Sequence, residues 1–148
     1  MAKNYPKIYL YKRIVQAKLF IDDHFNDDID LNNIADEAYF SKFHFIRLFK
    51  KIYGHTPHQY LTKVRIENAK SFLQRDISVT ETCFAVGFNS VSSFTGLFKK
   101  ITLLTPSAYQ LKIKNRQEQI KKIPFHFIPN CFLEQKAWSQ KSNFEEVL

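Results

Sequence analysis

The stretch that decides the fold is LFKKIYGHTPHQY at residues 48–60, which recurs as LFKKITLLTPSAY at residues 97–109. Eight of the 13 aligned positions are identical. Self-similarity on this scale indicates two copies of one structural unit. In each copy the apolar residues follow a helical spacing, and the Thr-Pro pair after them is typical of a new helix start. The repeat therefore predicts an all-α protein built from two similar helical units.

Helix-start signals divide the chain into about seven predicted helices. Thr56, Pro57 and Gln59 combine a capping box with proline at the first helical position. The other predicted starts that carry a capping residue are Asp30, Ser41, Ser78 and Ser90. The order predicts a helix, a tight turn and a second helix in each half, with the second helices over about 42–53 and 91–102.

Four segments follow from these signals. We predict a first helix-turn-helix subdomain over 7–55, a linker helix over 56–74, a second helix-turn-helix subdomain over 75–114, and an extended C-terminal tail over 115–148. Apolar and aromatic residues over 123–133 lie between two prolines. This segment either folds back over the helices or forms a dimer contact or partner surface, so both a monomer and a tail-mediated dimer stay open.

The positive charge is concentrated in the repeated region. The whole chain has a formal charge of +8, and residues 38–122 hold 15 Lys and Arg against four acids. Residues 22–37 hold seven acids and no Lys or Arg, which we interpret as a solvated loop. A basic region attracts polyanions and releases counterions when it binds nucleic acid. Solubility alone would also account for this charge.

Several classes of protein are disfavoured by composition. Two cysteines make no disulfide framework, and no apolar run approaches the ~20 residues of a membrane helix, so we expect a cytoplasmic protein with no membrane partner. Three glycines cannot form a phosphate cradle, and no nucleophile is paired with a base, so we expect neither an enzyme nor a cofactor. His55 and His58 lack the cysteines or carboxylates of a zinc site, so we expect no metal. Cys83 aligns with an inward position of the first copy, and we expect it in the core.

The second helix of each repeat has two different faces. One face carries Phe45, Leu48, Phe49 and Ile52 in the first copy and Phe94, Leu97, Phe98 and Ile101 in the second. We expect these residues to form the core. The opposite face carries Phe43, Ile46, Arg47 and Lys50, and then Ser92, Thr95, Gly96 and Lys99. Cations, hydroxyls and apolar groups that touch thymine methyls suit the edges of DNA bases.

The sequence resembles the DNA-binding domain of the AraC family of bacterial transcription regulators over about residues 14–113. The resemblance is carried by LNNIADEAYFSKFHFIRLFK at 31–50, GHTP at 54–57, Tyr60, Arg65, AVGF at 85–88, Phe94, Phe98, Lys99 and the Thr-Pro pair at 105–106. The resemblance implies sequence-specific control of transcription, usually activation, with both second helices in successive major grooves of double-stranded DNA. RNA polymerase is then a candidate protein partner.

Site residues follow from the resemblance by position. Base-reading roles fall on Phe43, Ile46, Arg47, Val91, Ser92 and Thr95. Contacts to the DNA backbone fall on Lys42, Lys50, Lys99, Lys100 and the helix start at Thr56. Few residues precede the first helix, as in the short stand-alone members of the family, so we expect no small-molecule effector.

The sequence departs from the family pattern at a few positions in the two copies. Gly96 stands where the family often has Arg, Tyr39 replaces a turn glycine, and Leu103-Leu104 replaces the glycine-containing stop of the first copy. These departures predict that the second copy reads bases weakly. A protein-interaction module that uses the Phe43 and Ile46 face and the apolar tail remains the alternative function. An RNA binder is disfavoured because no aromatic stacking platform is evident.

Overall fold

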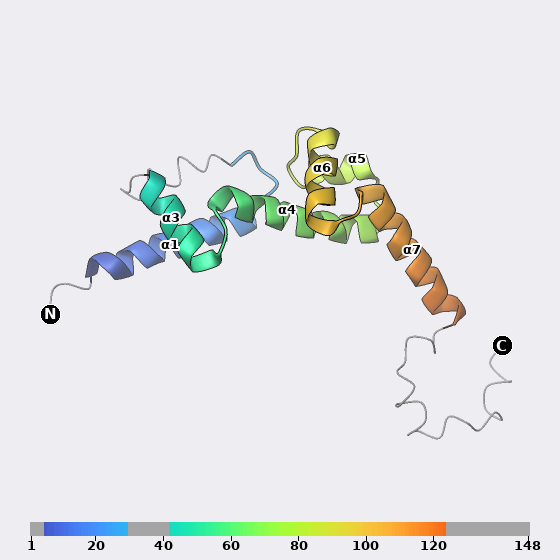
Figure 1. The fold of residues 1–148 in the computed structure, drawn as a ribbon, viewed down its shortest axis with the longest axis horizontal. Coiled ribbons are helices and arrows are strands. Elements are labelled where there is room, and N and C mark those ends of the chain that lie inside the picture. The colour runs from blue at the N-terminus through green and yellow to red at the C-terminus, as the bar shows by residue number, and fades with distance from the viewer. Residues whose placement is uncertain (1–4, 30–41, 124–148) are drawn as a thin grey trace, which may run out of the picture. The chain divides into compact units, whose positions relative to one another are not determined.

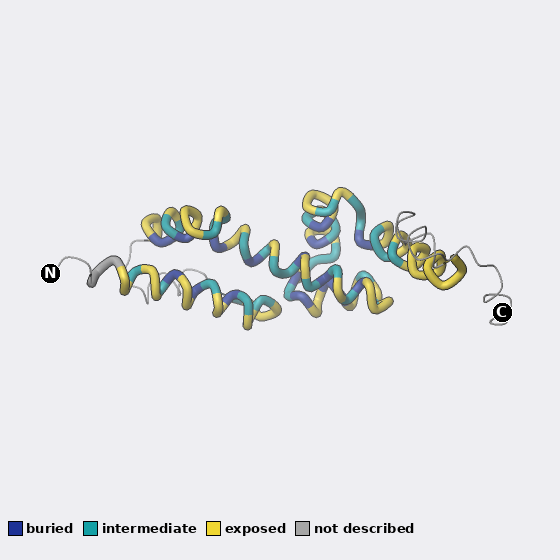
Figure 2. Tube along the Cα trace, turned by 90° about the horizontal axis from the view of Figure 1, so that it is seen from below, coloured by how far each residue is buried: buried dark blue, intermediate teal, exposed yellow. Residues whose placement is uncertain are grey.

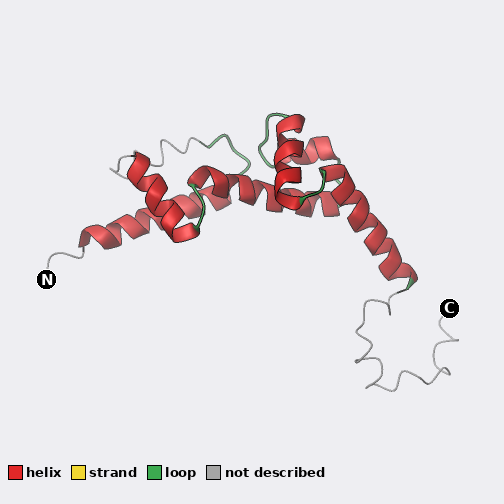
Figure 3. Cartoon of the chain, in the orientation of Figure 1, coloured by secondary structure: helices red, strands yellow, loops and turns green. Residues whose placement is uncertain are grey.

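Helices make up the regular structure of the part of the chain that the structure describes. The computed structural model describes residues 5–29 and 42–123, and over those two ranges it has helices and no strand (Figure 1 and Figure 3). The helices are α1 (Tyr5–Asp23), α3 (Lys42–Tyr53), α4 (Pro57–Gln74), α5 (Val79–Ala85), α6 (Val91–Thr102) and α7 (Pro106–Lys122). The prediction of an all-α fold is confirmed. The predicted helix near residues 31–38 and the chain beyond residue 123 lie outside the described residues.

The capping residues read from the sequence start α4 as predicted. The backbone N–H of Gln59 donates to the Thr56 hydroxyl at 3.3 Å, and the Thr56 N–H donates to the Gln59 side-chain oxygen at 3.0 Å. This reciprocal pair satisfies two N–H groups that the first turn would otherwise leave without partners. Pro57 is the first helical residue. At ~1.5 Å per residue, the 18 residues of α4 span about 27 Å.

The helices of the second copy are capped in the same way. Ser78 and Glu81 form a capping box at α5, and the Ser90 hydroxyl accepts from the Ser93 N–H at α6. Helix α5 ends at Ala85, and Gly87 follows two residues later. Its φ is +86°, a conformation that glycine adopts at little cost. The second helix-turn-helix unit thus forms from local signals.

Helix α7 is longer than expected. It continues through residues 115–122, which the predicted domain division placed in the C-terminal tail. Its last six residues include Glu118 and two lysines and no proline or glycine, so nothing local stops the helix before Lys122. The chain separates into two compact units, Met1–Tyr109 and Gln110–Leu148, and both copies of the repeated segment, 48–60 and 97–109, lie in the first.

Two hydrophobic cores share the linker helix. The first core contains Ile14, Ala17 and Ile21 of α1, Phe45 and Phe49 of α3, and Leu61 of α4. The second contains Ile66, Ala69 and Leu73 of α4 together with Cys83, Val86, Phe88, Phe94 and Phe98. Figure 2 shows these buried positions recurring along each helix between exposed ones. Because α4 contributes to both cores, it joins the two copies as a structural part of each.

The repeat is preserved in the ring packing. In the first copy the centroids of Phe45 and Phe49 lie 5.9 Å apart, and Phe49 meets Tyr60 at 5.8 Å with an interplanar angle of 65°. The equivalent distances in the second copy are 5.6 Å for Phe94 and Phe98 and 5.5 Å for Phe98 and Tyr109. Edge-on aromatic pairs at this spacing add stability beyond the area they bury.

The prediction was wrong for the last apolar position of each repeat. Ile52 and Ile101 were expected in the core, but their side chains are 40% and 43% exposed. In each copy the tyrosine of the next helix packs against the second phenylalanine, so the core is closed before the last helical turn. Leu48 and Leu97 are half-buried at the edge of the core.

Candidate nucleic-acid interface

The exposed face of α3 is opposite its two core phenylalanines. Phe43 is 76% exposed, and Arg47 and Lys50 are also exposed, while Phe45 and Phe49 are buried. The positions 43, 47 and 50 lie at i, i+4 and i+7, so the three side chains share one face of the helix. Exposure of this phenylalanine to water is unfavourable, because each Å² of apolar surface left in contact with water costs ~25 cal/mol of free energy relative to burial. The face therefore suits a partner that offers both apolar groups and negative charge.

The other predicted base-reading residues differ in how free they are. Ser92 is exposed, whereas Ile46, Val91 and Thr95 are half-buried. Ile46 packs against the first core and Val91 against the second. These two side chains therefore have a structural role, and only part of each is open to a ligand.

The predicted backbone-contact residues are mostly accessible. Lys42, Lys50, Lys99 and Lys100 are exposed, at the two ends of α3 and in the last turn of α6. Thr56 is half-buried, and its hydroxyl accepts the Gln59 N–H. The cap already uses that hydroxyl, so Thr56 differs from the four lysines in having little free hydrogen-bonding capacity.

Gly96 lies on the exposed face of α6 at the position that Arg47 occupies in α3. It is exposed, and a Cβ built there would meet no atom within 4 Å. Glycine in the interior of a helix costs about 1 kcal/mol relative to alanine. No packing or backbone requirement of the described structure explains glycine at this position.

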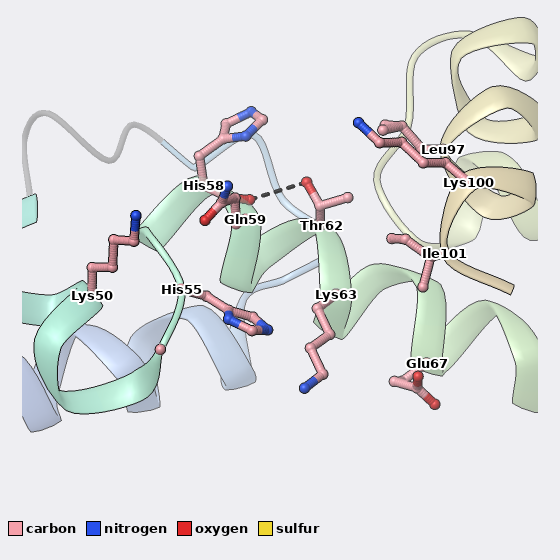
Figure 4. Close-up of a pocket in the computed structure, with 11 residues that line it drawn as sticks. Lys50, His55, His58, Gln59, Thr62, Lys63, Glu67, Leu97, Lys100 and Ile101 are labelled. Carbon is pink, nitrogen blue, oxygen red and sulfur yellow. Dashed lines mark hydrogen bonds between the residues drawn. The ribbon is translucent and has the colours of Figure 1, made fainter.

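A hollow of about 670 Å³ lies over α4 between the two repeated helices. It is lined by Lys50, Gly54, His55, His58, Gln59, Thr62, Lys63, Glu67, Leu97, Lys100 and Ile101. Figure 4 shows Lys50 and Lys100 extending into this space from the two sides, with His58 between them on α4. Thr62 donates to the His58 carbonyl at 3.0 Å. Three lysines and one glutamate give the lining a net positive charge.

Sequence reasoning missed the contribution of α4 to this surface. His55 and His58 were weighed as metal ligands, and Lys63 was given no role. A signal was present in the spacing, because Gln59 and Lys63 are at i and i+4 of α4, on the face opposite buried Leu61. That pattern indicates an outward face but does not reveal what borders it.

Arg65 holds the two helix-turn-helix units together from the middle of α4. Its Nε donates to the Phe25 carbonyl at 2.6 Å, and its Nη2 donates to the Asp27 carbonyl at 2.9 Å. Its guanidinium carbon lies 5.6 Å from the centroid of the Phe88 ring in the second unit. Burial lowers the pKa of Arg65, and the charge of Asp28 partly offsets that shift. The cation thus fixes the loop after α1 against the turn before α6.

Gly87 completes this junction. A Cβ at Gly87 would stand 2.7 Å from the Asn26 carbonyl oxygen and 3.0 Å from Nη2 of Arg65. Real side chains do not approach this closely, so the backbone of the loop and the turn can meet only because residue 87 is glycine. Within Met1–Tyr109, this junction sets how the two helix-turn-helix units are placed relative to one another.

The described residues also bear on metal binding, membrane crossing and the state of the cysteines. Over 5–29 and 42–123, no group of three His, Cys, Asp or Glu side chains is arranged to hold a metal ion. In the same ranges no helix has both the length and the apolar character needed to cross a membrane. Cys83 is fully buried as expected, and burial raises the pKa of its thiol. Cys131 lies outside the described residues.

Comparison with known proteins gives a consistent result. Residues 34–112 match a family described as a helix-turn-helix domain. The chain is 36% identical over 86 residues to the probable transcription factor PqrA of Proteus vulgaris, covering 57% of this chain and 70% of that protein. It is 34% identical over 97 residues to an uncharacterized HTH-type transcriptional regulator of Pseudoalteromonas carrageenovora, covering 66% of this chain and 58% of that protein. Eight curated relatives are matched over 26% to 70% of their own lengths.

A solved structure shares the arrangement of the helices. The DNA-binding domain of AdpA, described as a global transcriptional factor and solved in complex with a target DNA, superposes with a TM-score of 0.67 at 28% identity. The match covers 72% of this chain and 96% of that domain.

Proposed function

The chain belongs to the AraC family of helix-turn-helix proteins, and on that premise we propose that it regulates transcription by binding double-stranded DNA with α3 and α6. Each helix enters one of two successive major grooves on the same side of the duplex. Phe43, Ile46 and Arg47 of α3 and Val91, Ser92 and Thr95 of α6 read bases. The exposed lysines of both helices contact phosphates, which fix the register of the protein on DNA.

The observation that carries the proposal is the duplicated helix with matched buried and exposed faces. The ring distances in the two cores agree within a few tenths of an ångström, so α3 and α6 are fixed by the same packing. One helix of about 27 Å joins the two units, a length comparable to the ~34 Å turn that separates successive major grooves.

The hollow over α4 supports a parallel placement of the two helices. Lys50 faces it from α3, and the repeat pairs Lys50 with Lys99. On α6 the hollow is lined by Leu97, Lys100 and Ile101, which stand about 100° to 160° around the helix from Lys99. Different flanks of the two repeated helices therefore meet at the hollow, which is the arrangement expected when one unit is a translated copy of the other. A two-fold relation would bring equivalent flanks together.

Selection of bound sequences from random duplex DNA, repeated at two salt concentrations, tests the proposal. A preferred sequence with two contacted segments about one DNA turn apart is expected. The affinity should fall steeply as salt rises, because neutralised phosphates release counterions. Absence of any enriched sequence, together with an affinity insensitive to salt, would contradict DNA recognition.

The high exposure of Phe43 favours one second candidate, a protein-interaction module in which the Phe43 and Ile46 face binds an apolar partner. Burial of apolar surface has little dependence on ionic strength, so the same salt series separates the two functions. We also propose that the protein activates transcription through RNA polymerase and that it needs no small-molecule effector. A promoter reporter in cells with and without the protein gives the sign of regulation, and in vitro transcription with purified polymerase tests direct action.

A further inference from the structure

We propose that the linker helix α4 contacts DNA itself, and that the hollow between α3 and α6 receives the sugar-phosphate backbone separating the two contacted major grooves. This inference rests on the proposed function and adds Lys63 and His58 to the DNA-binding surface.

Three helices supply cations to the same hollow. Lys50 comes from α3, Lys63 from α4 and Lys100 from α6, and all three are exposed. Among the described residues, none of the three has an acidic group within ion-pair distance. The one acid of the lining, Glu67, pairs with Lys70 at 2.8 Å, which offsets its charge. The hollow therefore favours an anion.

The geometry of the duplex places backbone at this position. Two successive major grooves on one side of B-DNA are separated by a minor groove and the strands that border it. A protein with a helix in each major groove necessarily presents the surface between those helices to these strands. Duplex DNA carries one negative charge per ~1.7 Å of its axis, so an uncharged or acidic surface there would reduce the affinity.

The neutral residues of the lining also suit a backbone. His58 lies between Lys50 and Lys100 in Figure 4, and an imidazole N–H can donate to a phosphate oxygen in either charge state. Leu97 and the 43% exposed Ile101 form an apolar wall on the α6 side. Deoxyribose carbons between phosphates are the matching apolar surface, which accounts for an isoleucine that the core does not use.

The first test compares Lys63→Gln with Lys12→Gln in the full chain. Lys12 is an exposed lysine of α1 outside the hollow, so both variants lose one charge and should fold normally. On the selected duplex and on a random-sequence duplex alike, Lys63→Gln should weaken binding about two- to fivefold. The slope of log affinity against log salt should become shallower by about 0.9. Lys12→Gln should change neither. Equal behaviour of the two variants would overturn the inference.

A second test locates the contact on the DNA. Neutral methylphosphonates replace the phosphates between the two contacted segments of the selected duplex. Wild-type affinity should fall severalfold, whereas Lys63→Gln should lose little more, because its partner is already absent. If the neutral linkages leave wild-type binding unchanged, or weaken both proteins equally, Lys63 does not bind these phosphates. An Arg47→Ala variant that still relaxes the preference at one position of the selected site would leave the proposed function intact in that case.

Discussion

The guanidinium group of Arg65 in the linker helix lies over the ring of Phe88 in the second unit, 5.6 Å from its centroid, while it donates to carbonyls of the loop after α1. Arg65→Ala removes two charge-assisted hydrogen bonds and leaves the Phe25 and Asp27 carbonyls without that donor. We expect the free energy of unfolding to fall by about 1–3 kcal/mol in urea denaturation. The stability of Arg65→Lys should lie between those of the wild-type protein and Arg65→Ala, because an ammonium lacks the planar fork that reaches both carbonyls. A loss below about 0.5 kcal/mol for Arg65→Ala would show that the junction does not depend on it.

Gly87 and Gly54 form a matched pair for measuring close packing. Both have positive φ, but a Cβ at Gly54 meets nothing within 4 Å, whereas at Gly87 it meets the Asn26 carbonyl oxygen at 2.7 Å. Gly54→Ala should therefore cost only the backbone strain, about 1 kcal/mol. Gly87→Ala adds a steric clash and should cost at least 2 kcal/mol. Equal losses in thermal or urea unfolding would contradict the contact between the loop and the turn.

Leu103 adopts the left-handed conformation that Gly54 adopts in the first copy, with φ of 66°, although it is 83% exposed. Leu103→Gly should raise the free energy of unfolding by about 0.5–1 kcal/mol, because relief of left-handed strain exceeds the added entropy of the unfolded chain. Leu103→Ala retains a Cβ and should leave stability nearly unchanged. Destabilisation by the glycine variant would mean that the exposed leucine makes a contact worth more than its strain.

Substitution of Gly96 tests the weak reading expected for the second copy. Gly96→Ala should stabilise the protein by about 1 kcal/mol, since α6 has open space at that position. Gly96→Arg should also tighten DNA binding and sharpen the sequence preference under the second unit, because it restores the cation that Arg47 supplies in the first. The readouts are urea denaturation and binding-site selection. An equally strong preference under both halves in the wild-type protein would refute the weak-reading hypothesis.

Arg47→Ala measures base reading directly. We expect a loss of about 1–3 kcal/mol in binding free energy on the preferred duplex, with relaxed preference at one position of the site. The matched control is Arg116→Ala, which removes an exposed arginine of α7 that is not among the proposed contact residues. Equal losses on preferred and random duplexes would reassign Arg47 to phosphate contact.

Local sequence signals were sufficient to predict the helices. The caps at Thr56, Ser78 and Ser90 were predictable because each depends on residues within three or four positions. The exposure of Ile52 and Ile101 was not, because it depends on a tyrosine ring from the following helix. The same limit applies to Arg65, which contacts loop carbonyls 38 and 40 residues away. The hollow over α4 could not be predicted, because its lining comes from three helices whose relative positions the sequence does not give. The sequence shows the lysines but not that they line the same hollow.

Phe25 is partly buried against both hydrophobic cores. A side chain shared in this way couples the melting of the two halves, because loss of order in either one exposes apolar surface that the other also uses. The amide protons of α3 and α6 should then exchange with solvent at similar rates, as parts of a single cooperative unit. If α3 and α6 occupy successive grooves as proposed, such coupling would keep the distance between the two helices constant.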